Sequence, residues 1–206
     1  MSPASTLESL FWILASFLAG SLPLSLWLGK YVLGVDIRDF GDGNPGAANV
    51  WRAAGRYWGL SAVLLDSLKG AIPVGLAHLW RGIDQWPLVL IALAPVLGHA
   101  YSPFLGFKGG KALAVSFGIW AGLTVWLGPS VLGVIMAFWL ALLTVEGWAV
   151  LLGMLSFLGF WIFYNPESTL LAVCIGNLLI LAWKHRLELR NPPALRSWVK
   201  VWEQKN

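Results

Sequence analysis

Long apolar runs alternate with short polar segments along the chain, and this pattern predicts membrane-spanning helices. A run of about 17–25 mostly apolar residues is long enough to cross the hydrocarbon core of a bilayer. We expect seven spans, at about residues 7–29, 57–80, 86–105, 112–127, a short one ending near 145, 148–163 and 169–183. The fourth to sixth are short, so tilted or partly re-entrant helices, and a total of six spans, stay open.

Composition excludes a water-soluble domain. Of the 206 residues, 58% are hydrophobic and 12% are charged, and the mean hydropathy is +0.71. A soluble domain carries about 25% charged residues, so this chain has too little polar surface to coat a soluble globule. We therefore predict an all-α membrane protein, a compact bundle of about seven transmembrane helices, in which residues 1–206 form a single domain.

Basic residues gather in three segments that lie on one side of the membrane if the chain has seven spans. The opposite connections hold only Arg81. Cytoplasmic loops carry an excess of lysine and arginine, so we predict an external N-terminus and a cytoplasmic C-terminus. The three basic segments contain Lys30, Arg38, Arg52 and Arg56; Lys108 and Lys111; and Lys184, Arg186, Arg190, Arg196, Lys200 and Lys205.

The polar segment 41–52 reads Gly-Asp-Gly-Asn-Pro-Gly-Ala-Ala-Asn-Val-Trp-Arg. Its glycines let backbone amides approach a ligand closely, and Asn44, Asn49 and Arg52 are spaced to face one pocket. The segment also matches G-x-G-x-x-G, but a dinucleotide site needs a βαβ unit, and here a membrane span lies on each side. A plain connecting loop is the alternative.

A second glycine-rich segment, residues 106–111, reads Gly-Phe-Lys-Gly-Gly-Lys and directly precedes a predicted span. Exposed amides, a helix N-terminus and two ammonium groups together favour binding of an anion. It is not a P-loop, because Ala112 stands where a serine or threonine should follow the lysine. The alternative is a basic membrane anchor with a flexible hinge.

Other polar residues near the spans have structural and functional interpretations. The cluster 184–186 is typical of segments that bind anionic lipid headgroups, while His185 could donate a hydrogen bond near neutral pH. Asp66 and Lys69 are spaced to meet on one helix face, as a structural ion pair or as lining of a site. His99 lies near the predicted inner interface. No metal-ligand spacing occurs in the sequence.

Five blocks in this order resemble the bacterial acyl-phosphate-dependent glycerol-3-phosphate acyltransferases, over nearly the whole chain. This resemblance implies a seven-span inner-membrane enzyme of early phospholipid synthesis with its active site on the cytoplasmic side. It implies transfer of a fatty acyl group from acyl phosphate to the 1-hydroxyl of glycerol 3-phosphate, giving lysophosphatidic acid and phosphate. It implies no metal, nucleotide cofactor or nucleic-acid partner. The blocks are residues 20–23, 43–52, 65–70, 98–99 with 104–111, and 184–186.

The resemblance also implies roles for individual residues. Lys111, Arg52 and His185 are the expected catalytic residues, and Asn44 orients the glycerol phosphate with Arg52. The Gly109 and Gly110 amides are expected on phosphate oxygens, with the substrate's own phosphate assisting proton removal. The expected substrate-binding residues are Asp42, Gly43, Asn44, Gly46, Asn49, Lys69, His99, Lys108, Gly109, Gly110 and Glu188.

Two departures from the family pattern place carboxylates near the expected phosphate. Asp42 stands where the family has serine, and Glu188 stands where it has asparagine. Two unit charges about 4 Å apart interact by roughly 1 kcal/mol in water and about 4 kcal/mol at an effective dielectric of 20. Repulsion of that size would weaken binding roughly tenfold to several hundredfold, unless an arginine or lysine offsets it.

These departures keep other functions open. An acyltransferase with a different acceptor is a close variant. A catalytically weak homologue with a lipid-binding or accessory role is the alternative from another class, although the intact segment 106–111 argues against it. A transporter would need ionisable groups near mid-membrane in several spans, and only Asp66 and Lys69 come close.

Overall fold

The computed structural model of the protein describes residues 5–199 and builds them from eight α-helices joined by short π-helical and 3₁₀ segments. Within that range the only β-pairing is an isolated bridge between Leu143 and Leu195. The all-α prediction is confirmed. Lys200 and Lys205 of the predicted basic tail lie outside the described residues.

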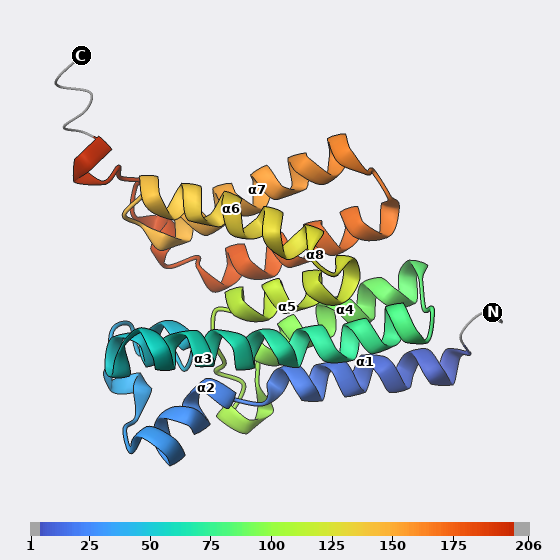
Figure 1. The fold of residues 1–206 in the computed structure, drawn as a ribbon, viewed down its shortest axis with the longest axis horizontal. Helices are drawn as coiled ribbons and strands as arrows, with labels where there is room; N and C mark the ends of the chain where they lie inside the picture. Colours follow the sequence, from blue (N-terminus) through green and yellow to red (C-terminus); the bar gives the residue numbers. More distant parts are fainter. Residues whose placement is uncertain (1–4, 200–206) are drawn as a thin grey trace. The chain divides into compact units, whose positions relative to one another are not determined.

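The chain forms two compact units, one ending at Pro129 and one beginning at Ser130 (Figure 1). A single domain over the whole chain stays a prediction. The first unit contains α1 (Thr6–Ser21), α2 (Leu24–Trp27), η1 (Leu28–Leu33), η2 (Ile37–Asp39), α3 (Ala47–Gly75), η3 (Leu76–Trp80), α4 (Gln85–Ala100), η4 (Pro103–Leu105) and α5 (Leu113–Thr124). The second contains most of α6 (Leu127–Leu142), then α7 (Glu146–Tyr164), α8 (Ser168–Lys184) and η5 (Glu188–Arg190).

The apolar segments coincide in order with the predicted spans. Four helical segments are long and apolar enough to cross a membrane: Thr6–Leu33, Ala47–Trp80, Gln85–Leu105 and Glu146–Tyr164. Three shorter apolar helices fall on the remaining predicted spans: Leu113–Thr124, Leu127–Leu142 and Ser168–Lys184. The placement of the two termini relative to the membrane stays a prediction.

In the first unit α3 packs against α5 and also against α1, which Figure 1 shows beside it. Glycines let α3 and α5 approach closely. A Cβ atom at Gly118 would overlap the Ser67 carbonyl oxygen, and one at Gly122 would lie 2.9 Å from the Ala71 carbonyl oxygen. Membrane helices associate through such small-residue contacts, because the lipid gives no hydrophobic drive for association. This packing holds rigid the helices from which the polar segments extend.

The first span is interrupted between α1 and α2, and two polar side chains hold the interruption. Lys69 Nζ donates to the Leu22 carbonyl at 2.8 Å, and Ser102 Oγ donates to the Ser21 carbonyl at 2.6 Å. The last carbonyls of a helix lack intrahelical partners, and Pro23 has no N–H to continue the pattern. The two donors replace water at a break in a membrane helix.

Lys69 also forms the ion pair that its spacing from Asp66 predicts, with 2.8 Å between Nζ and Oδ1. Ser25 Oγ donates to Asp66 Oδ2 at 2.5 Å, and Asp66 and Lys69 are only 1% and 5% exposed. This geometry supports the structural interpretation of the pair. Lys69 as a substrate-binding residue stays a prediction.

In the second unit, side chains that follow η5 donate hydrogen bonds to carbonyls at the C-terminal end of α6. Arg196 Nε donates to the Leu140 and Leu143 carbonyls at 2.9 and 3.2 Å, and Trp198 Nε1 donates to the Ala141 carbonyl at 3.0 Å. The guanidinium therefore stands at the negative end of the helix dipole and satisfies carbonyls that the helix leaves unpaired.

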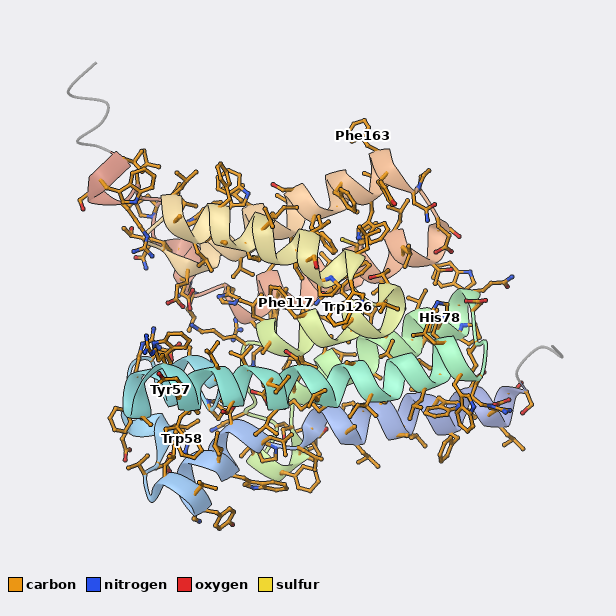
Figure 2. All side chains as sticks on the ribbon, viewed as in Figure 1. Tyr57, Trp58, His78, Phe117, Trp126 and Phe163 are labelled. Carbon is orange, nitrogen blue, oxygen red and sulfur yellow. The ribbon has the colours of Figure 1, made fainter. Side chains whose placement is uncertain are left out.

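Aromatic residues mark the two ends of α3 and its extension η3. Figure 2 shows Tyr57 and Trp58 toward one end and His78 toward the other. Tyr57 is 72% exposed in the isolated chain. Aromatic rings with polar atoms favour the membrane–water interface, and this placement fits a helix whose two ends lie at opposite interfaces.

Candidate functional site

The first glycine-rich segment folds as a turn that runs directly into α3. That helix begins at Ala47, before the predicted start of the span near residue 57. The helical turns that begin at Ala47 contain polar and small residues, so the hydropathy pattern did not predict them. Gly55 interrupts the helix with φ 81° and ψ −174°, so Asn49 and Arg52 lie on a separate helical piece before the span proper.

Asp42 is the residue on which the two polar segments converge. Its Oδ1 accepts hydrogen bonds from the Asn44 backbone N–H at 3.2 Å and from Asn49 Nδ2 at 3.1 Å. Its Oδ2 lies 2.5 Å from Lys111 Nζ, in the second glycine-rich segment. The structure thus brings together the two segments that sequence analysis singled out, and it shows which pair of side chains joins them.

Asn49 holds the remaining groups of this cluster in place. It is fully buried; its Nδ2 donates to the Asn44 carbonyl at 2.9 Å, and its Oδ1 accepts from Arg52 Nη1 at 2.7 Å. Arg52 Nη1 is 4.0 Å from Asp42 Oδ1. The guanidinium charge therefore acts on Asp42 from a longer distance than the Lys111 ammonium does.

Glycine is required at two positions of the turn. Gly41 and Gly43 have φ values of 58° and 72°, which side chains disfavour. A Cβ at Gly41 would also lie 2.5 Å from Asn49 Oδ1 and 2.8 Å from Arg52 Nη1. Gly41 was missing from the predicted site residues, although the repeated glycines were a signal for it. Gly46 has extended backbone and ordinary space around it, so its amide rather than its lack of a side chain is available for a role.

The environment of Asp42 keeps it ionised. Partial burial opposes the charge, but the hydrogen bond and the positive charge of Lys111 outweigh burial and hold the pKa of Asp42 below its ordinary value of 3.8. The nearby Asp36 pairs with Arg38 instead, and the hydrogen bonds of that pair lower the pKa of Asp36 to about 2. Two of the three carboxylates between η1 and α3, Asp36 and Asp42, thus have different partners.

The second glycine-rich segment packs against the end of α4. The Gly110 N–H donates to the His99 carbonyl at 3.0 Å. A Cβ at Gly109 would overlap that carbonyl oxygen, and a Cβ at Gly110 would overlap His99 Nε2. These glycines therefore let the segment lie on His99. The Gly110 amide is bonded within the protein in this structure, and its expected contact with phosphate stays a prediction.

Lys111 is carried by strained backbone at the start of α5. Ala112, the residue before that helix, has φ 66°, in the left-handed region that costs a non-glycine residue on the order of 1 kcal/mol or more. The N-terminal amides of α5 follow directly and add positive potential beside the ammonium. Lys108 is exposed in the same segment.

In the second unit His185 and Glu188 form a pair. His185 Nδ1 is 3.1 Å from Glu188 Oε2, and His185 is 3% exposed. Its Nε2 is buried and has no hydrogen-bond partner among residues 5–199. A Cβ at Gly147 would lie 2.9 Å from the Glu188 Cβ, so this glycine makes room for the pair. A shared role of His185 with the first unit's polar segments stays a prediction.

The cluster in the first unit suits a phosphate group. Lys111, Arg52, Asn49 Nδ2 and the Asn44 N–H supply two positive charges and neutral donors within one small region. Phosphate oxygens accept such hydrogen bonds most strongly from charged donors. Within the described part of the chain, no group of three or more His, Cys, Asp or Glu could hold a metal ion.

Comparisons with known proteins agree with this chemistry. The family model described as glycerol-3-phosphate acyltransferase matches residues 10–192. The glycerol-3-phosphate acyltransferase 1 of Thermotoga maritima is 39% identical over 195 residues, covering 87% of this chain and 95% of that protein. The glycerol-3-phosphate acyltransferase of Aquifex aeolicus is 35% identical over 185 residues, covering 87% and 93%.

Solved structures show the same fold. PlsY (YgiH), described as an integral membrane glycerol 3-phosphate acyltransferase, superposes in its glycerol 3-phosphate form with a TM-score of 0.78 and 31% identity, covering 94% of this chain and 98% of that one. Its lysophosphatidic acid form gives 0.77 and 32%, covering 88% and 90%. With its multi-pass membrane fold and a family match over most of its length, this chain belongs to the glycerol-3-phosphate acyltransferase family of membrane enzymes.

Proposed function

We propose that this acyltransferase moves a fatty acyl group from acyl phosphate to the 1-hydroxyl of glycerol 3-phosphate, giving lysophosphatidic acid and inorganic phosphate. The observation that carries the proposal is the convergence of Lys111, Asn49 and the Asn44 N–H on one anionic group, with Arg52 beside it. Both substrates carry a phosphate, and relatives named for glycerol 3-phosphate share this fold.

The expected chemistry needs positioning and charge stabilisation. The acceptor hydroxyl oxygen attacks the acyl carbonyl carbon, the bond from that carbon to the phosphate oxygen breaks, and the hydroxyl proton leaves on a phosphate oxygen. In this proposal Lys111 stabilises the negative charge that builds up, and a preorganised donor of this kind contributes about 10²–10³ in rate. Arg52, which donates a hydrogen bond to Asn49, would orient the acceptor phosphate.

His185 is the third proposed catalytic residue. A carboxylate only accepts hydrogen bonds, so Glu188 requires a proton on His185 Nδ1. The neutral ring then presents Nε2 as an acceptor, and a protonated ring presents it as a donor. As an acceptor this nitrogen could receive a hydrogen bond from a substrate hydroxyl, and as a donor it could contact a hydroxyl or a phosphate, which is the role the family resemblance implies.

The proposed location is the inner membrane of a bacterium, with the polar segments on the cytoplasmic side. The support is the excess of Lys and Arg in these segments and the seven apolar helical segments between and beyond them. The proposed acyl donor and the lysophosphatidic acid product fit this location, because both are lipids. Membrane lipids would be the surrounding partners, in early phospholipid synthesis.

The direct test is an assay with purified protein in lipid, acyl phosphate and labelled glycerol 3-phosphate. We expect lysophosphatidic acid from the wild type and at least about a hundredfold less from Lys111→Ala. Lys30→Ala removes the same charge from an exposed lysine beside Tyr31 and should retain activity. Product at or below the level of Lys111→Ala from folded wild type would remove the proposal.

A different acceptor is the second candidate, because the Asp42 carboxylate stands within the cluster that should receive a phosphate. The same assay with labelled glycerol in place of glycerol 3-phosphate distinguishes the two. A faster reaction with glycerol would favour the altered acceptor. No transfer to either would favour an accessory role.

A further inference from the structure

The Asp42 carboxylate makes the contacts that a phosphate would need. One oxygen contacts the Lys111 ammonium, and the other accepts from the Asn49 amide and the Asn44 backbone N–H. All three partners are donors, and one is a full positive charge. A carboxylate and a phosphate compete for such a set, because both are anions that only accept hydrogen bonds from these groups.

We propose that Asp42 sets the phosphate affinity of this site: its carboxylate takes the position of the anion in the substrate-free protein, and a phosphate must draw Lys111 away from it. The proposal rests on the proposed function in taking a phosphate as the ligand. Asp42 then determines affinity without taking part in the acyl transfer.

The charges around the cluster decide the direction of the effect. Lys111 and Arg52 carry two positive charges, and Asp42 cancels one of them in the free protein. A phosphate dianion that binds beside an ionised Asp42 meets repulsion across a few ångströms. This repulsion corresponds to roughly tenfold to several hundredfold in affinity, depending on how much water reaches the site.

The ion pair also holds the two polar segments together before substrate binds. Lys111 and Asp42 come from different segments, and their contact ties the turn before α3 to the segment before α5. A weaker affinity for phosphate has a benefit, because inorganic phosphate is a proposed product and would otherwise stay bound in the site. Removal of the carboxylate should therefore strengthen substrate binding and product inhibition together.

The experiment measures the affinity of the full-length protein in detergent for inorganic phosphate by titration calorimetry. Asp42→Asn keeps the size and one acceptor oxygen and removes the charge. Asp36→Asn is the matched control, because it removes a carboxylate from the same connection between η1 and α3, and its partner is Arg38. We expect about tenfold or tighter phosphate binding in Asp42→Asn and a change of less than about twofold in Asp36→Asn.

Two further variants separate electrostatics from folding. Asp42→Ser should also bind phosphate more tightly, and thermal unfolding identifies any variant that is not folded. In a Lys111→Ala background, the gain from Asp42→Asn should shrink, because the contested ammonium is absent. Equal or weaker phosphate binding by folded Asp42→Asn and Asp42→Ser would overturn the proposal and assign Asp42 to substrate binding or to structure.

Kinetics give a second readout. With glycerol 3-phosphate, Asp42→Asn should lower KM and the inhibition constant of inorganic phosphate by similar factors. A purely structural Asp42 would instead lower kcat or stability without tightening phosphate inhibition. Since the calorimetry needs no turnover, tighter phosphate binding without any acyl transfer would retain this inference and reject the proposed function, whereas transfer with unchanged phosphate binding would do the reverse.

Discussion

Glu188 Oε2 accepts a hydrogen bond from His185 Nδ1 across 3.1 Å, and this contact fixes which ring nitrogen carries the proton. The neighbouring Gly147 leaves space for the pair, and His185 is almost fully buried. Partners of this kind orient histidine rings. We therefore predict that the Glu188 carboxylate, which the sequence placed near the expected phosphate, positions the His185 ring.

Glu188→Ala should lower kcat at least about tenfold, because the His185 ring loses its orienting acceptor. Glu188→Gln keeps an acceptor oxygen and should restore much of the activity. The chain has three histidines, so ¹⁵N NMR of the rings, with His78 and His99 variants for assignment, can follow the tautomer directly. An unchanged tautomer and unchanged kcat in Glu188→Ala would remove this role.

Gly110→Ala should destabilise the protein by about 1–3 kcal/mol, because the added Cβ would overlap the His99 ring. The double variant Gly110→Ala with His99→Ala removes the ring that is overlapped, so its loss should be clearly less than the sum of the single losses. Gly109→Ala meets a backbone carbonyl, and His99→Ala should give it no relief. Thermal unfolding in detergent measures the three single and two double variants. Simple additivity at Gly110 would contradict the packing role.

Hydropathy predicted the spans of the second unit well, as at α7 (Glu146–Tyr164) and α8 (Ser168–Lys184). A long apolar run in lipid forms a helix, because a helix satisfies its own backbone hydrogen-bonding groups. It missed the helical start at Ala47, where small and polar residues lower hydropathy without preventing a helix. The sequence pattern indicated the residues of the cluster around Asp42, but it did not predict which of them pair. Contacts such as Asp42 with Lys111 join segments 69 positions apart (111 − 42), and a single sequence carries no signal of them.

Lys69→Met should lower stability by about 3–5 kcal/mol, because it leaves the buried Asp66 carboxylate without its positive partner. Adding Asp66→Asn removes the unpaired charge, so the double variant should be more stable than Lys69→Met alone. Lys30→Met, at an exposed lysine, should stay within about 0.5 kcal/mol of the wild type. If the double variant is the least stable of the three, the ion pair is not the source of the loss.

The pair of Asp42 and Lys111 should make a contribution to stability that acid removes. The pKa of Asp42 in the folded protein lies below its ordinary value of 3.8, because the contact with Lys111 outweighs partial burial, and Arg52 is the other charge facing it. A lowered pKa means that the contribution is complete above about pH 4 and is lost as the pH falls through the folded value.

The difference in melting temperature between wild type and Asp42→Asn should therefore stay constant from about pH 7 to 5 and shrink below about pH 4. In a Lys111→Ala background, the same substitution should show a smaller difference and a weaker dependence on pH, because the ammonium that lowers the pKa is gone. A difference that grows on acidification would mean that protonated Asp42 is the form that stabilises the fold, and the carboxylate could then not act as the anion held by Lys111.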